Sequence, residues 1–232
     1  MTRKPSEARS ASVEIPVSTG MLHGDFVLPA RPRGVVLFAH GSGSSRHSPR
    51  NRLVAATLQR AGLATLLMDL LTEQEERSER AGGMLRFDVQ LLGERLSGAS
   101  TWLRQAAELR ALRIGYFGAS TGAAAALIAA AAEPERVSAV VSRGGRPDLV
   151  EPELLRLVTA PCLFIVGGDD REVLALNRQA CSHLRHERRI EVIPGASHLF
   201  EEPGALEHVA ALARDWLLHW LEPPEKSERT RP

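Results

Sequence analysis

The 232-residue chain lacks several features that mark particular classes of protein. Its two cysteines are too few for a disulfide framework, which predicts a reducing compartment. No apolar run reaches the roughly 18 residues that a membrane span needs, and the basic N-terminus has no hydrophobic segment of a signal peptide. We therefore expect a cytoplasmic protein that does not bind a membrane. A net charge of only +1 argues against nucleic acid as the main partner.

Motifs for metal ions and nucleotide phosphates are also missing. The sequence contains no C-x-x-C, H-E-x-x-H or clustered His/Cys spacing, and no G-x-x-x-x-G-K-[ST]. Gly41 and Gly43, with Asp69 after the next predicted strand, make half of a dinucleotide fingerprint, but Arg46 stands at the third glycine position. We therefore expect neither a metal nor a cofactor.

What the chain does contain is an alternation of apolar runs and amphipathic segments. Two short strands at 12–17 and 22–28 come first. Strands are then predicted at 34–40 and 63–70, which read as buried, and at 112–118, 137–142, 162–168 and 189–195. Helices are predicted at 49–62, 84–108, 121–133, 151–158, 172–185 and 205–221. Repeated strand–helix units predict an α/β fold with a mainly parallel central sheet and helices on both faces.

The same pattern predicts the domain organisation. Residues 12–222 form a single α/β domain, because no repeat or linker divides them. Residues 1–11 and 223–232 are polar, contain proline and are expected to be flexible tails. In a parallel sheet, functional residues follow the carboxyl ends of the strands, so the chemistry is expected there.

A G-x-S-x-G sequence, residues 118–122, lies between a predicted strand and a predicted helix. Such a turn places the serine at a strained backbone angle, and its neighbours two positions away must be small. The helix N-terminus beneath the hydroxyl favours negative charge. Ser120 is therefore the candidate nucleophile, although a chance match in a Gly- and Ala-rich segment is the alternative.

A serine hydroxyl needs a base, and the base needs an acid to orient it. His198 lies in the loop after the last predicted strand, and Asp169 and Asp170 follow the strand at 162–168. The chain order Ser, Asp, His is the order of α/β-hydrolases and differs from that of chymotrypsin and subtilisin. A chance arrangement would need three coincidences in this order.

An oxyanion hole is the fourth expected element. His40 is followed by Gly41, Ser42 and Gly43 at a strand end, and glycines allow backbone N–H groups to approach a reacting oxygen. We expect one donor from Ser42 or Gly43, and the other from Thr121, the residue after the nucleophile. Gly41 and Gly43 are also candidates for binding the substrate.

The sequence resembles α/β-hydrolases, and among them the small proteins related to dienelactone hydrolase. The resemblance rests on "HGSGSS", "GASTG", "GGDDREV" and "GASHLF", and extends from about residue 12 to residue 221. Asp170 matches the family's acid position in G-x-x-D-x-x-V, which favours it over Asp169. Dienelactone hydrolases use cysteine where this chain has Ser120, so their lactone substrate cannot be carried over. The segment "SRGGRPDL" resembles a bacterial subgroup, some of whose members are joined to phosphoribosyltransferase domains.

These observations predict a serine hydrolase that cleaves small carboxylic esters, thioesters or lactones, as a monomer or small homo-oligomer. The alternative is a hydrolase-fold protein that binds a ligand without catalysis. Only residues 143–161 separate two strands where larger hydrolases carry a lid, so no large lid is expected. Arg46 and Arg143, with Arg50 and Arg146, follow strand ends and are candidates for binding a substrate anion, or for pairing with nearby acids.

Overall fold

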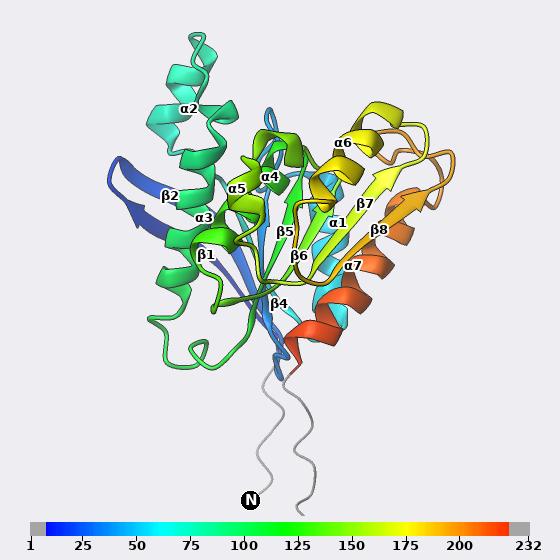
Figure 1. Cartoon of the computed structure of the whole chain (residues 1–232). Helices are drawn as coiled ribbons and strands as arrows, with labels where there is room; N and C mark the ends of the chain where they lie inside the picture. The colour runs from blue at the N-terminus through cyan, green and yellow to red at the C-terminus, as the bar shows by residue number, and fades with distance from the viewer. Residues whose placement is uncertain (1–7, 223–232) are drawn as a thin grey trace, which may run out of the picture.

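A computed structural model describes residues 8–222 and contains one eight-stranded sheet (Figure 1). The strand order is β1-β2-β4-β3-β5-β6-β7-β8. β1 and β2 are antiparallel to each other, β2 is antiparallel to β4, and the other neighbours are parallel. The strands are β1 (Arg9–Val17), β2 (Gly20–Leu28), β3 (Val35–Ala39), β4 (Ala64–Met68), β5 (Ile114–Ala119), β6 (Val137–Arg143), β7 (Cys162–Gly167) and β8 (Arg188–Ile193).

Helices cover both faces of the sheet, as the alternating pattern predicts. α1 (Pro49–Arg60) and α7 (Ala205–Leu221) lie together on one face, and α3 (Val89–Leu103), α4 (Thr121–Ala132) and α6 (Arg171–Cys181) cover the other (Figure 1). Each face therefore has its own apolar core, and every residue of β5 is buried between the two. α3 and α4 pack closely where α3 has a glycine: a Cβ at Gly93 would lie 2.7 Å from a side-chain carbon of Ile128 in α4.

Several boundaries differ from the prediction, notably those of β1 and α3. β1 begins at Arg9, so residues 9–11, expected in a flexible tail, pair with β2. The helix expected over 84–108 is shorter, because a 3₁₀ turn η1 (Leu85–Phe87) precedes it and Asp88 caps α3 by accepting a hydrogen bond from the backbone of Leu91. Residues 104–112 form turns instead. The tails expected at 1–7 and 223–232 lie outside the described residues.

A further helix was not predicted. α2 (Glu73–Arg80) begins at Thr72, whose hydroxyl accepts from the N–H of Glu75 while the Glu75 carboxylate accepts from the N–H of Thr72. This reciprocal capping stabilises a helix that has almost no apolar side. α2 lies near the carboxyl ends of the parallel strands, at the top of Figure 1.

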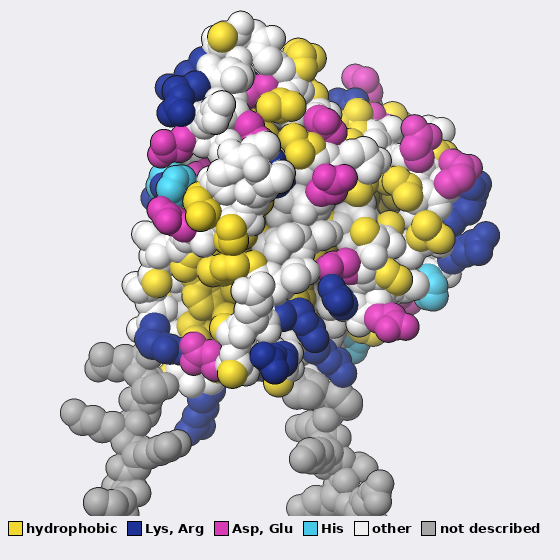
Figure 2. Space-filling view, turned by 90° about the vertical axis from the view of Figure 1, so that its left-hand side faces the viewer, with side chains coloured by type: hydrophobic (Ala, Val, Ile, Leu, Met, Phe, Trp, Pro, Cys, Tyr) yellow, Lys and Arg dark blue, Asp and Glu magenta, His cyan; other side chains and the backbone are white. Residues whose placement is uncertain are grey.

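Residues 144–161 hold only a 3₁₀ turn, η2 (Pro147–Leu149), and α5 (Pro152–Leu155), which confirms that the fold has no large lid. In residues 8–222, none of the helices combines the length and apolar character that crossing a bilayer requires. On the face shown in Figure 2, basic and acidic side chains are interspersed with apolar ones.

Candidate active site

Ser120 stands on the sharp turn between β5 and α4 with φ 52° and ψ −121°. This conformation is strained for a residue with a side chain. Its glycine neighbours have no room for a Cβ: one at Gly118 would lie 2.4 Å from the Cα of Ala123, and one at Gly122 would lie 2.2 Å from the carbonyl oxygen of Ala39. The G-x-S-x-G spacing is thus explained by packing, because only glycine fits at both positions.

Hydrogen bonds on both sides of the turn hold Ser120 in place. Its N–H donates to the carbonyl of Arg143 at 3.2 Å, and its carbonyl accepts from the N–H groups of Ala123 at 3.0 Å and Arg146 at 3.2 Å. The end of β6 therefore supports the strained serine directly.

His198 and Asp170, far apart in the sequence, are brought together by the loops after β8 and β7. Their Nδ1 and Oδ2 atoms are 2.7 Å apart, and the Asp170 side chain is 15% exposed while that of His198 is 38% exposed. A carboxylate can only accept, so Nδ1 carries the proton and Nε2 keeps a free lone pair. The acid that His198 contacts is Asp170, while Asp169 is exposed.

Gly144 lies between the candidate base and the nucleophile's supporting strand. A Cβ at Gly144 would be 3.5 Å from both Nδ1 and Cε1 of His198, and its φ of +51° also favours glycine. Among the described residues, no hydrogen bond joins Ser120 to His198. Such bonds are often long before substrate binds, so the arrangement is compatible with proton transfer in a complex.

The loop after β3 packs against Ser120. A Cβ at Gly41 would lie 3.2 Å from the Cβ of Ser120, so the next residue is held beside the start of α4. The N–H of Ser42 donates to the Thr121 hydroxyl at 2.8 Å. Thr121 is the first residue of α4, and its own N–H has no acceptor within that helix. The two predicted oxyanion donors are therefore neighbours, and Gly43 lies exposed beyond them with φ +74°.

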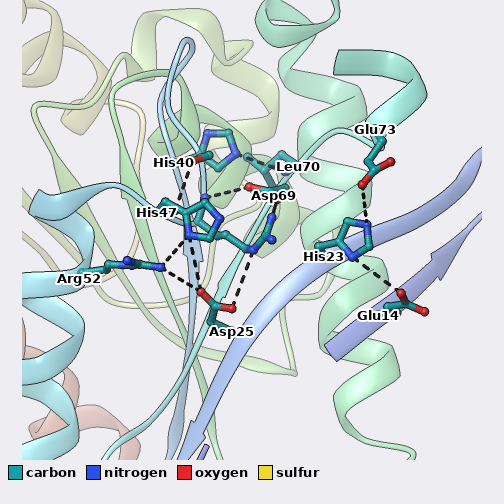
Figure 3. A network of polar contacts seen from close by, with 11 residues as sticks. Glu14, His23, Asp25, His40, His47, Arg52, Asp69, Leu70 and Glu73 are labelled. Atoms are coloured by element: carbon teal, nitrogen blue, oxygen red, sulfur yellow. Dashed lines mark hydrogen bonds and ion pairs between the residues drawn. The ribbon is translucent and has the colours of Figure 1, made fainter. Parts of the chain in front are cut away.

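His40 holds the loop after β3 through two hydrogen bonds. Its Nδ1 donates to the Gly41 carbonyl at 2.9 Å, and its Nε2 accepts from the N–H of Leu70 at 3.3 Å (Figure 3). Burial lowers the pKa of His40 below its ordinary value. The imidazole is therefore neutral and serves as a donor at one nitrogen and an acceptor at the other.

Arg46 forms ion pairs with two aspartates. Its N–H donates to Asp69 at 2.8 Å, its guanidinium pairs with the same carboxylate, and Asp25 lies 3.8 Å from its Nε. Asp25 and Asp69 are both labelled in Figure 3. Arg52 binds Asp25 at 3.3 Å and His47 at 2.6 Å. The structure thus places Arg46 in an ion-pair cluster that also holds the aspartate considered for a dinucleotide site.

The other strand-end arginines have different surroundings. Arg146 forms two hydrogen bonds with Asp148, at 2.8 and 2.7 Å, which is one of the pairings the sequence suggested. Arg50 binds the exposed Glu201 at 3.3 Å. Arg143, at the end of β6, is only 8% exposed and forms no ion pair with another described residue.

A cavity of about 220 Å³ opens beside the oxyanion loop. Residues 40–44 form one side of it, and Leu71, Glu76 and Arg86 from α2 and its surroundings are among those on the other. The sequence did not predict the side of the cavity that α2 forms, because α2 has no apolar stripe. The Thr72-x-x-Glu75 capping box was the signal that would have found it.

The sheet order and the strand–turn–helix at Ser120 define an α/β-hydrolase fold. Residues 22–222 match the dienelactone hydrolase family, and the chain belongs to that family. The crystal structure of a dienelactone hydrolase from Anabaena variabilis is 54% identical, with 94% of this chain and 100% of that chain covered and a TM-score of 0.91. Fold and family support a hydrolase function.

Two curated relatives extend the comparison. "Putative phosphoribosyl transferase Rv0571c" of Mycobacterium tuberculosis is 52% identical over 219 residues, which are 94% of this chain and 48% of that protein. The chain spans about half the length of this relative. "Probable 2-oxo-3-(5-oxofuran-2-ylidene)propanoate lactonase" of a Bradyrhizobium species is 28% identical, with 84% of this chain and 80% of that protein covered.

Proposed function

We propose that the chain is a serine hydrolase of small carboxylic esters, thioesters or lactones, and that Ser120, His198 and Asp170 form its catalytic triad. The observation that carries this proposal is the pairing of His198 with Asp170 at 2.7 Å, in loops at the same end of the sheet as a serine held at φ 52°. Strain of this kind is retained where surrounding structure enforces it, and it is common at catalytic residues.

In the proposed mechanism, the Ser120 hydroxyl attacks the ester carbonyl and His198 Nε2 takes its proton. Asp170 keeps the imidazole in the required tautomer and stabilises its charged form. The oxygen that becomes negative accepts hydrogen bonds from the N–H groups of Ser42 and Thr121, which requires the Thr121 hydroxyl to release Ser42. His198 then returns the proton to the leaving alcohol, and water hydrolyses the acyl-enzyme.

The size of the neighbouring cavity supports small substrates. About 220 Å³ beside the oxyanion loop is less than the roughly 300 Å³ at the lower end of pockets for drug-sized ligands. Without a large lid, long acyl chains would have little apolar surface to bind. We therefore expect activity to fall as the acyl chain lengthens.

Hydrolysis of 4-nitrophenyl acetate and butyrate tests the proposal. The wild type should turn over both esters, and Ser120→Ala should lose at least about a thousandfold in kcat, because the nucleophile acts as a unit with its base. Equal rates of hydrolysis in the wild type and Ser120→Ala would contradict the proposed catalytic triad. A wild type without turnover would favour the alternative of a hydrolase-fold binding protein.

A further inference from the structure

The central sheet ends in two edge strands, β1 and β8, and the two edges differ. An edge strand presents unpaired backbone N–H and C=O groups, which can pair with another chain unless the edge is protected. β1 contains Pro16, which has no N–H, whereas β8 contains no proline and lies at the right-hand edge of the sheet in Figure 1. β8 is therefore the less protected of the two edges.

The backbone groups of β8 divide into an inner and an outer set. The carbonyl of Glu187, just before β8, accepts from the N–H of Cys162 in β7 at 2.9 Å. Because alternate residues of a strand bond to the same neighbour, the odd-numbered residues of β8 face β7. The outward N–H and C=O groups belong to Arg188, Ile190 and Val192. No backbone hydrogen bond of the described residues reaches this outer set.

The side chains of β8 alternate between the two faces of the sheet. Arg189 and Glu191 lie on the face that α7 covers, where they form an ion pair with each other. With Trp216 and Trp220 of α7 they line a groove of about 460 Å³. Ile190 lies on the opposite face and packs against the apolar core there. The free edge of β8 is thus continuous with a groove that contains two tryptophans, a residue type enriched at protein interfaces.

The sequence of β8 is complementary to itself in an antiparallel pair. With a two-fold axis at Ile190, this residue faces its own counterpart, and the two exchange both of their outward hydrogen bonds. Arg188 of each chain then faces Val192 of the other, and their outward groups pair in the same way. Arg189 of each chain faces Glu191 of the other, which makes two pairs of opposite charge. Such directly opposed pairs stabilise antiparallel strands.

Other registers of the same pair are less favourable. A two-fold axis at Arg188 or Arg189 would set identical arginines against each other, and an axis at Glu191 would do the same with glutamates. An axis one residue further along would bring Pro194, which has no N–H, into the ladder. Axes between residues would pair an outward-facing residue with an inward-facing one. Charge and backbone pattern together therefore select the axis at Ile190.

We propose that the chain forms a two-fold dimer in which β8 pairs with β8 of a second copy, centred on Ile190, so that the two sheets become one. The axis is perpendicular to the sheet, so both α7 helices lie on the same face, one on each side of the junction. The partner's α7 then closes the groove at Trp216 and Trp220. This contact adds the buried area that strand pairing alone lacks, since stable interfaces bury about 1,200 Å² or more. The dimer does not depend on the proposed esterase function.

Sedimentation velocity over a range of protein concentrations tests the dimer by charge reversal. The wild type should sediment with twice the mass of the monomer. Arg189→Glu and Glu191→Arg each set like charges against one another, so the dimer dissociation constant should rise at least about tenfold in either variant. An equimolar mixture of the two variants should dimerise again, because every acidic side chain then faces a basic one. The double reversal in one chain should also restore the dimer.

Controls separate this interface from folding and from net charge. Arg110→Glu makes the same change of charge at an exposed turn before β5 and should remain dimeric. Val192→Pro removes one outward N–H from each chain and should be monomeric with an unchanged far-UV circular dichroism spectrum. Hydrogen exchange of residues 187–193 should be slower in the wild type than in Glu191→Arg. A monomeric wild type, a dimer that the single reversals leave intact, or a mixture that stays monomeric would overturn the proposal.

Discussion

The arginines on the two sides of Ser120 differ in whether an acidic side chain balances their charge. On the β4 side, Arg46 contacts Asp69 and Asp25. The neutral His40 holds the same loop through separate hydrogen bonds with Gly41 and Leu70 (Figure 3). On the β6 side, Arg143 is more deeply buried and has no acid partner in the described part of the chain. Arg46 lies in the loop after β3 and Arg143 is the last residue of β6, so both lie near the carboxyl ends of parallel strands and this position alone does not separate them. The charge of Arg46 is balanced by two aspartates, and its backbone bond to Asp69 holds the loop. The Nε and Nη1 atoms of Arg143 have no hydrogen-bonding partner among residues 8–222.

The largest effect is expected at the centre, where both flanks meet. Asp170→Asn should lower kcat on the order of 10⁴-fold, because the amide cannot hold His198 in the productive tautomer. Asp169→Asn is the matched control and should keep most of the activity, since its side chain is exposed. Steady-state kinetics on both variants check this. Similar losses for the two would reassign the acid.

On the side of Ser120 where Arg46 lies, substitutions should lower the free energy of unfolding. Arg46→Gln should lower the free energy of unfolding by about 1–3 kcal/mol, because it leaves the partly buried Asp69 carboxylate without its charged donor. Arg52→Gln, which removes a more exposed contact with Asp25, should cost about 0–1 kcal/mol. Urea denaturation measures both. Equal stability losses in the two variants would contradict the structural role assigned to the pair of Arg46 and Asp69.

The same flank should also respond to pH through His40. Burial lowers its pKa in the folded state, so below about pH 6.5 the unfolded chain takes up a proton that the folded chain does not. The contribution of His40 to stability is therefore complete above that value and is lost as the pH falls below it. Unfolding free energies at pH 7.5 and 5.5 should differ less in His40→Gln than in the wild type. An unchanged difference would assign the acid sensitivity to other groups.

The smallest effect is expected on the side of Ser120 where Arg143 lies. Glu201→Gln removes the carboxylate that faces Arg50. Since such exposed pairs contribute about 0.2–1 kcal/mol, the free energy of unfolding should fall by no more than that amount, as urea denaturation measures. Hydrolysis of 4-nitrophenyl butyrate should be unaffected. A loss of more than about 1 kcal/mol would contradict the assignment of Glu201 to a solvent-screened pair.

The fold was predictable where local pattern and burial agree. The continuous apolar runs of β3, β5 and β7 mark strands covered on both faces, and the helix at 205–221 has the bounds that its periodicity predicted. α2 was missed because a polar helix lacks that signal. β1 extends to Arg9 because backbone pairing with β2 stabilises residues whose side chains are exposed.

The site was predictable where chemistry requires a short spacing. The glycines on either side of Ser120 predict the sharp turn. The chain order of the acid and the histidine predicts the contact between Asp170 and His198. The pairing of Arg146 with its near neighbour Asp148 was predictable, but the partners of Arg46 were not, because Arg46 meets Asp25 and Asp69 only through the sheet order. For the same reason, the bond from Ser42 to the Thr121 hydroxyl appears only when β3 lies beside β5.

Labelling with an active-site fluorophosphonate tests the central claim most directly. This reagent forms a covalent bond with an activated serine, and mass spectrometry of the digested protein locates the adduct. The account predicts one adduct, on Ser120, formed rapidly in the wild type and at least a hundredfold more slowly in His198→Gln. An unmodified Ser120 in the folded wild type, or equal labelling in the histidine variant, would contradict it.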